Sequence, residues 1–242
     1  MSAEEMLLED LRIKNGHYTA VWQSGISGTQ HWQGGMTAQE FDKVSHAQAE
    51  AGRRIHCISV DGDSLAAVWR DGSGQQEWHV GLPHDDFKKT DEKWAKQGLR
   101  IQAISVDGGN IACCWRPGTG EYAWIANTSR DKLTATNKAW RKHGLSMVKL
   151  AVDDSGLLNT GGEWTAVWAG PKTATEWGSI LAFDLDSSSA NAAKKGLRIV
   201  ALGAWQAGIG PAVPPPTGGG GGRDGNGDGG GGGIEIDIGD DD

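Results

Sequence analysis

The sequence predicts a β-rich α+β domain built from four tandem repeats of about 46 residues, each with the order strand, strand, strand, helix. Two observations lead to this prediction. The stretch from Gly52 to Gly98 begins again at Gly98 with a similar sequence that runs to Gly144. A short apolar motif, Ala-Val-Trp in three of its four copies, recurs along the whole chain and ends at Trp22, Trp69, Trp115 and Trp168.

Two further positions define the copies. A second Trp follows the first after nine or ten residues, at Trp32, Trp78, Trp124 and Trp177. An apolar anchor stands eleven residues before a Gly in every copy, at Phe41, Phe87, Leu133 and Leu185. The four copies therefore span about 5–51, 52–97, 98–143 and 144–195, and an insertion at 153–164 lengthens the fourth copy.

Within a copy, the residue types predict the elements in order. A run rich in β-branched residues ends in Asp-Gly, which is typical of a tight hairpin turn. A second run reaches the first Trp, which follows small apolar residues and is expected in the core against the helix. A Gly-rich turn then leads to a third run around the second Trp. The helix then ends at the Gly that opens the next copy, and Thr37 with Glu40 predicts a capping box at the start of the first helix.

The end of the repeat domain carries a single extra strand, 196–205, which begins a fifth copy. Such a strand either closes a ring or caps an open array. We expect closure into a propeller-like ring, with the open array as the alternative. The repeat domain then covers 1–210, and 211–242 is a Pro/Gly-rich acidic tail that we expect to be disordered from about Pro214.

Charge and hydropathy limit the function. Most of the net charge of −8 lies in the tail, so the repeat domain is nearly neutral and has no basic surface for nucleic acid. No apolar run approaches the length of a membrane span, and the N-terminus does not resemble a signal peptide. These features predict a cytoplasmic protein, although leaderless secretion stays open.

The positions shared by the copies are turn and core residues, so the sequence predicts no enzyme. Ser129 and Lys132 fit the S-x-x-K spacing of some serine nucleophiles, but Ser129 stands where a helix needs an N-cap, and we expect that role. The three cysteines are expected to be reduced, with Cys113 and Cys114 on opposite faces of one strand.

The second Trp series is the candidate binding site. It follows polar turns, which places it at a surface, where Trp rings can stack on glycans or hold extended peptides. The ligand-binding prediction comprises this series and its charged or imidazole neighbours: Trp32, Trp78, Trp124, Trp177, His31, Glu77, His79 and Glu176. The alternative is that these Trp residues fill gaps between the repeats.

The tail contains one pattern that fits an EF-hand loop. Asp224, Asn226, Asp228 and Glu235 have the spacing of calcium ligands. The sequence predicts no helices on either side of the loop, and an Asp/Gly-rich tract meets the pattern easily by chance. Weak or absent calcium binding is the favoured interpretation.

The repeat resembles the bacterial tandem repeat domain family, and it is similar to the repeats of the N-terminal domain of fungal polyglycine hydrolases. The resemblance covers about residues 5–205 and is carried by Gly52, Arg54, Ala67-Val68-Trp69, Trp78, Gly81-Leu82, Phe87 and Trp94-Ala-Lys-Gln-Gly98. It implies a repeat fold without the catalytic domain, whose serine lies elsewhere in those hydrolases.

Together these patterns predict a non-enzymatic binding or adaptor module with repeated Trp-lined sites for glycan or extended peptide. The alternative is a structural or assembly subunit that docks through the repeat domain. In that case the acidic Gly-rich tail is a partner-binding or calcium-responsive segment.

Overall fold

The computed structural model describes residues 6–153, 163–170, 177–181, 194, 202–205 and 233–237 of the 242. The second repeat shows the unit most simply. It consists of β4 (Arg53–Asp61), β5 (Ser64–Asp71), β6 (Glu77–Pro83) and α2 (His84–Ala95). The predicted order of three strands and a helix is therefore confirmed.

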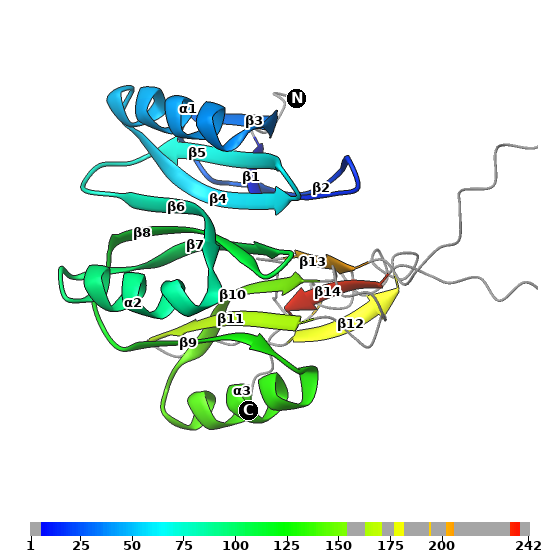
Figure 1. The fold of residues 1–242 in the computed structure, drawn as a ribbon. Helices are drawn as coiled ribbons and strands as arrows, with labels where there is room; N and C mark the ends of the chain where they lie inside the picture. Colours follow the sequence, from blue (N-terminus) through cyan, green and yellow to red (C-terminus); the bar gives the residue numbers. More distant parts are fainter. Residues whose placement is uncertain are drawn as a thin grey trace, which may run out of the picture.

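The other repeats follow the same order (Figure 1). The first contains β1 (Met6–Lys14), β2 (His17–Ser24), β3 (Gln30–Met36) and α1 (Ala38–Glu50). The third contains β7 (Leu99–Asp107), β8 (Asn110–Pro117), β9 (Tyr122–Thr128) and α3 (Arg130–Lys142). The described strands of the fourth are β10 (Ser146–Asp153), β11 (Glu163–Ala169) and β12 (Trp177–Leu181), followed by β13 (Leu202–Trp205) and β14 (Gly233–Asp237).

The sheets do not coincide with the sequence repeats. Three of the described antiparallel sheets take their third strand from one repeat and their first two strands from the next, in the orders β3-β5-β4, β6-β8-β7 and β9-β11-β10. The first sheet, β1-β2, has two strands. Neighbouring repeats are therefore interlocked by main-chain hydrogen bonds as well as by side chains.

Short turns and one recurring bulge shape every hairpin. Asn15 and Gly16 in the β1–β2 turn both have positive φ, as a type I′ turn requires. The register of the first strand shifts at the same place in each repeat, for example between Ile55 and Cys57 and between Ile101 and Ala103.

The predicted capping box of α1 is present, since Thr37 and Glu40 bind each other's backbone N–H groups.

The Arg of the G-x-R pattern joins the start of a repeat to the preceding helix. Arg54 donates to the carbonyl oxygen of Ala49 at 3.0 Å, and Arg100 donates to that of Ala95 at 3.2 Å. These carbonyls lie at the C-terminal ends of α1 and α2 and also accept from the backbone N–H groups of Gly52 and Gly98. The signature Arg is therefore a structural residue that adds a second hydrogen bond at a helix end.

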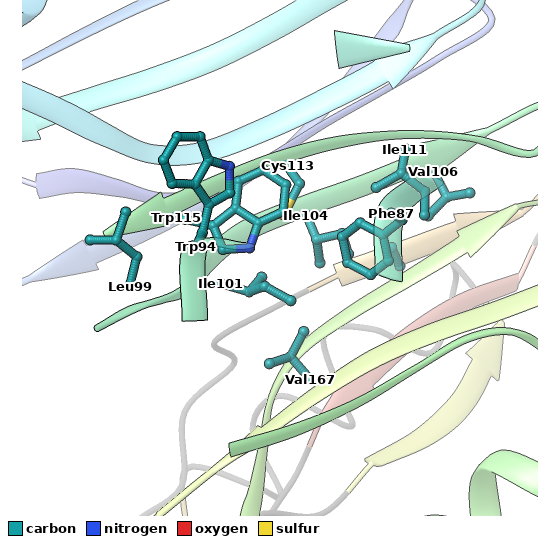
Figure 2. Close-up of a cluster of buried hydrophobic side chains, with 11 residues drawn as sticks. Phe87, Trp94, Leu99, Ile101, Ile104, Val106, Ile111, Cys113, Trp115 and Val167 are labelled. Carbon is teal, nitrogen blue, oxygen red and sulfur yellow. The ribbon is translucent and has the colours of Figure 1, made fainter. Parts of the chain in front are cut away.

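The core is built around contacts between a helix and the Trp of the next repeat. The ring of Phe41 in α1 lies 6.0 Å from that of Trp69 in β5, and Phe87 in α2 lies 6.1 Å from Trp115 in β8. Leu133 of α3 and Trp168 of β11 share a third cluster. These six side chains are completely buried, as Figure 2 shows for the cluster of Phe87 and Trp115. The predicted core role of Trp69, Trp115 and Trp168 is confirmed.

The remaining first-series residue differs from the prediction. Trp22 was expected in the core, but 49% of its surface is exposed. The reason is that Trp22 belongs to the first repeat, and no described helix precedes that repeat to cover it. The adjacent cysteines follow their prediction, since Cys113 and Cys114 point into two different core clusters.

The first strands of successive repeats lie side by side. β1 contacts β4, β4 contacts β7 and β7 contacts β10, while β13 contacts both β10 and β1. Arg12 of β1 reaches across this group and donates to the carbonyl oxygen of Leu150 at 3.0 Å. Among the described strands, no hydrogen-bonded sheet closes on itself.

One segment of the tail forms a strand. β14 lies between β12 and β13 and is antiparallel to both, with Ile236 opposite Gly178 and Leu202. It occupies the place that β5, β8 and β11 hold in the other sheets. The rest of the tail, for which we predicted disorder, lies outside the described residues.

We expect Phe87→Ala to lower the free energy of unfolding by about 3–5 kcal/mol, because it removes the anchor that fills the space over Trp115. Urea denaturation followed by circular dichroism measures this loss. Lys89→Ala is the matched control on the same helix, since its side chain is 81% exposed and its loss is expected to be near zero. A loss below about 1 kcal/mol for Phe87→Ala would show that the anchor is not needed.

Candidate binding surface

Two members of the second Trp series lie in the spaces between neighbouring sheets. Trp78 of β6 is half-buried, and its Nε1 donates to Asp42 Oδ1 of α1 at 3.1 Å. Trp124 of β9 is half-buried too, with its ring centroid 4.7 Å from that of Phe87 in α2. Each of these Trp residues therefore packs against the helix of the preceding repeat. This is the gap-filling arrangement, the alternative to an exposed binding series.

A buried carboxylate organises the space around α2. Asp91 is 5% exposed and accepts from Trp115 Nε1 at 2.9 Å, Trp124 Nε1 at 2.8 Å and the Tyr122 hydroxyl at 2.6 Å. Three donors thus compensate one buried charge. Burial, together with the Asp91 carboxylate, raises the pKa of the Tyr122 hydroxyl well above its ordinary value.

The residue four positions after the anchor also accepts from an indole N–H in α3, but it does not do so in α1. Asn137 of α3 accepts from Trp168 Nε1 at 2.8 Å. In α1 this position is Ser45, and neither its hydroxyl nor Trp69 Nε1 has a partner among the described residues. Sequence reasoning missed this acceptor position, although the repeat spacing of Asp91 and Asn137 from their anchors could have revealed it.

The first repeat exposes its aromatic side chains. Trp22 is 49% exposed, Trp32 51% and Tyr18 47%. In the repeat register, Trp22 corresponds to Trp69, and Trp32 corresponds to Trp78. We call these three residues the aromatic surface.

The aromatic surface faces a single space between two sheets. Directly opposed residues of antiparallel strands point to the same face, and the three aromatics stand opposite members of one buried cluster. Tyr18 is opposite Ile13, Trp22 opposite Leu8, and Trp32 opposite Val68. The aromatic surface therefore borders the space between the β1-β2 sheet and the β3-β5-β4 sheet.

The other predicted ligand-binding residues do not join this surface. His31 and His79 lie against core rings, 5.7 Å from Trp69 and 6.0 Å from Trp115. Glu77 accepts a hydrogen bond from Gln75 at 3.1 Å. The side chains of Glu176 and Trp177 lie outside the described residues. Among the described members of the predicted set, only Trp32 belongs to the aromatic surface, and sequence analysis missed Tyr18 and Trp22.

The described residues offer little chemistry elsewhere. Burial raises the pKa of the Cys57 and Cys114 thiols to about 12, so neither is a ready nucleophile. The hydroxyl of Ser129 accepts from the Lys132 backbone N–H and caps α3, as predicted. Within the described ranges, no group of His, Cys, Asp or Glu is arranged to hold a metal ion.

The calcium prediction falls mainly on undescribed residues. Asp224, Asn226 and Asp228 lie outside the described ranges. Glu235 is a residue of β14, opposite Ser179 and Gly203. The EF-hand interpretation of the tail therefore stays a prediction. In the part of the chain that the structure covers, no helix is both long and apolar enough to cross a membrane.

A cluster of charged groups fixes the β1-β2 sheet to its neighbour. The carboxylate of Glu9 lies 3.0 Å from Arg70 Nη1 and 3.4 Å from His56 Nε2. The hydrogen bond from His56, with the charges of His56 and Arg70, lowers the pKa of Glu9 to about 2. This cluster joins β1 to β4 and β5 and so frames the space that the aromatic surface borders.

Comparison with known families supports the repeat interpretation. Residues 73–113 match the sequence model of a family described as polyglycine hydrolase-like, structural repeat. The match runs from the turn before β6 to β8, across the junction between two repeats. It confirms the resemblance seen in the sequence. No protein of curated function matches the chain.

We expect the contribution of Glu9 to stability to disappear in acid. The folded pKa of about 2 lies below the ordinary value of 4.5, so this contribution is fully present above pH 4.5 and is lost as the pH falls towards 2. The shift corresponds to at most about 3 kcal/mol, and partial solvent exposure reduces this to about 1–2 kcal/mol.

Urea denaturation of the wild type and Glu9→Gln tests this. The difference in unfolding free energy should be about 1–2 kcal/mol at pH 6 and should shrink as the pH is lowered to 2.5. A difference that stays constant with pH would contradict the assignment, since Gln cannot titrate.

Proposed function

We propose that this chain is a non-enzymatic binding module whose aromatic surface holds a polypeptide ligand. One observation carries the proposal. Tyr18, Trp22 and Trp32 are about half exposed, whereas Trp69 and Trp115, which correspond to Trp22, are completely buried. Exposed aromatic residues that border an apolar space are typical of interaction sites.

The backbone around this surface favours a peptide over a glycan. β2 pairs with β1 along one edge, and its other edge carries no described strand. An extended peptide can add to such an edge through main-chain hydrogen bonds while its side chains meet the Trp rings. A glycan would use the rings alone and would leave the strand edge unpaired.

The comparisons and the chemistry of the chain are compatible with a module that is not an enzyme. The matching family model describes a structural repeat, not a catalytic domain. The three cysteine thiols are buried, and the hydroxyl of Ser129, although exposed, is used as the N-cap of α3.

We also propose that the repeats close into a propeller-like ring, with the open array as the alternative. Contacts of β13 with both β1 and β10 support closure, because they place the strand that begins the fifth copy next to the first strand of the first repeat. Arg12 supports it as well, since one side chain from β1 reaches the carbonyl oxygen of Leu150 in β10. A ring would fix the first and last repeats beside each other.

A second candidate function is that of an assembly subunit that docks through the repeat domain. The strand β14 favours it, because a segment remote in sequence enters the fold by adding to β12 and β13. Assembly by strand addition at β2 would use the same kind of pairing.

We expect Trp22→Ala and Trp32→Ala each to weaken ligand binding at least tenfold, because each removes an exposed ring of the aromatic surface. A library of extended peptides and a glycan array are screened in parallel by intrinsic Trp fluorescence, and Lys89→Ala is the control. Glycan binding that depends on Trp22, without peptide binding, would assign a glycan ligand. Failure of both screens would contradict the binding proposal.

A further inference from the structure

The three described helices pack on one plan. α1 and α2 lie between adjacent sheets, α3 packs on the β9-β11-β10 sheet, and each helix places its anchor against the first Trp of the following repeat. The helix also presents a polar residue to an indole N–H: Asp42 to Trp78, Asp91 to Trp115 and Trp124, and Asn137 to Trp168. A helix that packs at such a position therefore carries an apolar anchor and a nearby side-chain oxygen that accepts from an indole N–H.

Beneath the aromatic surface lie buried residues equivalent to those beneath α1, although no described helix covers the aromatic rings. Leu8, Leu11 and Ile13 correspond in register to Ile55, Ile58 and Val60. Across the space stand Cys57, Ala66 and Val68, which correspond to Ala103, Ala112 and Cys114 of the next space. These six residues form one buried cluster, and among the described residues no helical side chain belongs to it.

The β1-β2 sheet has no third strand among the described strands. The middle strands β5, β8 and β11 each carry a third strand, namely β3, β6 and β9, on the edge away from the first strand. The corresponding edge of β2 carries none among the described strands. In every filled position the third strand runs directly into the helix, as β6 does into α2 at residues 83 and 84. A strand added to this edge of β2 and a helix packed over the aromatic surface would therefore belong to one continuous segment.

We propose that the first repeat accepts a strand–helix segment from a partner protein, a proposal that rests on the proposed binding function. The strand of the segment pairs with β2. Its helix lies over Trp22 and Trp32, with Phe or Leu at the anchor and an acid or amide four residues later. Figure 1 shows the template for this arrangement in α1, which follows β3 and packs beside β5.

Hydrogen-bond complementarity assigns the acidic group. Asp91 accepts from both indole N–H groups of its space, those of Trp115 and Trp124. The corresponding donors of the first repeat, Trp22 and Trp32, have no acceptor assigned among the described residues. A carboxylate placed as in α2 would satisfy both donors as they become buried.

A second copy of this chain offers no described segment of this kind. The anchors Phe41, Phe87 and Leu133 are completely buried within their own chain. Their helices would have to leave their own spaces to enter another molecule. Since the three described helices do not supply the occupant, we assign it to a different protein whose amphipathic strand–helix segment is free.

The test uses the full chain and a fluorescent synthetic peptide that copies residues 77–97, which include β6 and α2. Fluorescence anisotropy should show saturable binding. We expect the changes Phe87→Ala or Asp91→Ala in the peptide to weaken binding at least tenfold, and Lys89→Ala in the peptide to leave it unchanged. Trp22→Ala in the protein should cause a similar loss, with circular dichroism to confirm that the variant is folded.

A double-mutant cycle isolates the proposed hydrogen bond. Trp22→Phe keeps an aromatic ring and removes the indole N–H. It should therefore weaken binding of the wild-type peptide and have a smaller effect on binding of the Asp91→Ala peptide. Hydrogen exchange of residues 17–24 should slow when the peptide is bound, because its strand protects the open edge of β2.

Three results would overturn the proposal. If extended peptides bind but Phe87→Ala in the probe peptide leaves its binding unchanged, the strand–helix segment is refuted and the binding function stands. Binding without protection of β2 would refute the strand pairing. Self-association of the chain that Trp22→Ala abolishes in sedimentation measurements would assign the site to a second copy.

Discussion

The contact between the anchor of one helix and the Trp of the following repeat is the interaction on which the fold depends. Phe41, Phe87 and Leu133 each cover a Trp that belongs to the next repeat. The third strand behaves in the same way, since it completes the sheet of the next repeat. A single repeat therefore cannot bury its own apolar face, and stability comes from the interfaces between repeats.

This interlocking makes the two ends of the array unlike its middle. The first repeat has nothing described before it, so Trp22 and the edge of β2 stay open. At the other end, β14 supplies the middle strand beside β12 and β13, and Ile236 takes the register position that Ala67 holds in β5.

The sequence predicted what the repeat period determines, namely the three strands, the helix, the caps and the buried Trp69, Trp115 and Trp168. It could not show whether a helix packs on its own repeat or on the next, because both arrangements have the same spacing. For this reason Trp22 was assigned to the core and Trp78 to a surface. The spacing of Asp91 from its anchor recurs at Asn137, but the donors that meet Asp91 come from two strands of the next repeat, and their meeting is seen only in the structure.

The residue four positions after the anchor, which is Ser45, Asp91 or Asn137, separates the effect of apolar burial from that of hydrogen bonding to an indole. Trp69 is completely buried although its indole N–H has no described partner beside Ser45. Apolar burial against Phe41 therefore holds Trp69 without a hydrogen bond to its indole, even though an unsatisfied buried donor costs about 1–3 kcal/mol. Asp91 and Asn137 remove that cost at the other interfaces. By the same reasoning, the anchor provides most of the affinity for a segment entering the first repeat. The acid or amide four residues later distinguishes the correct segment from other apolar helices.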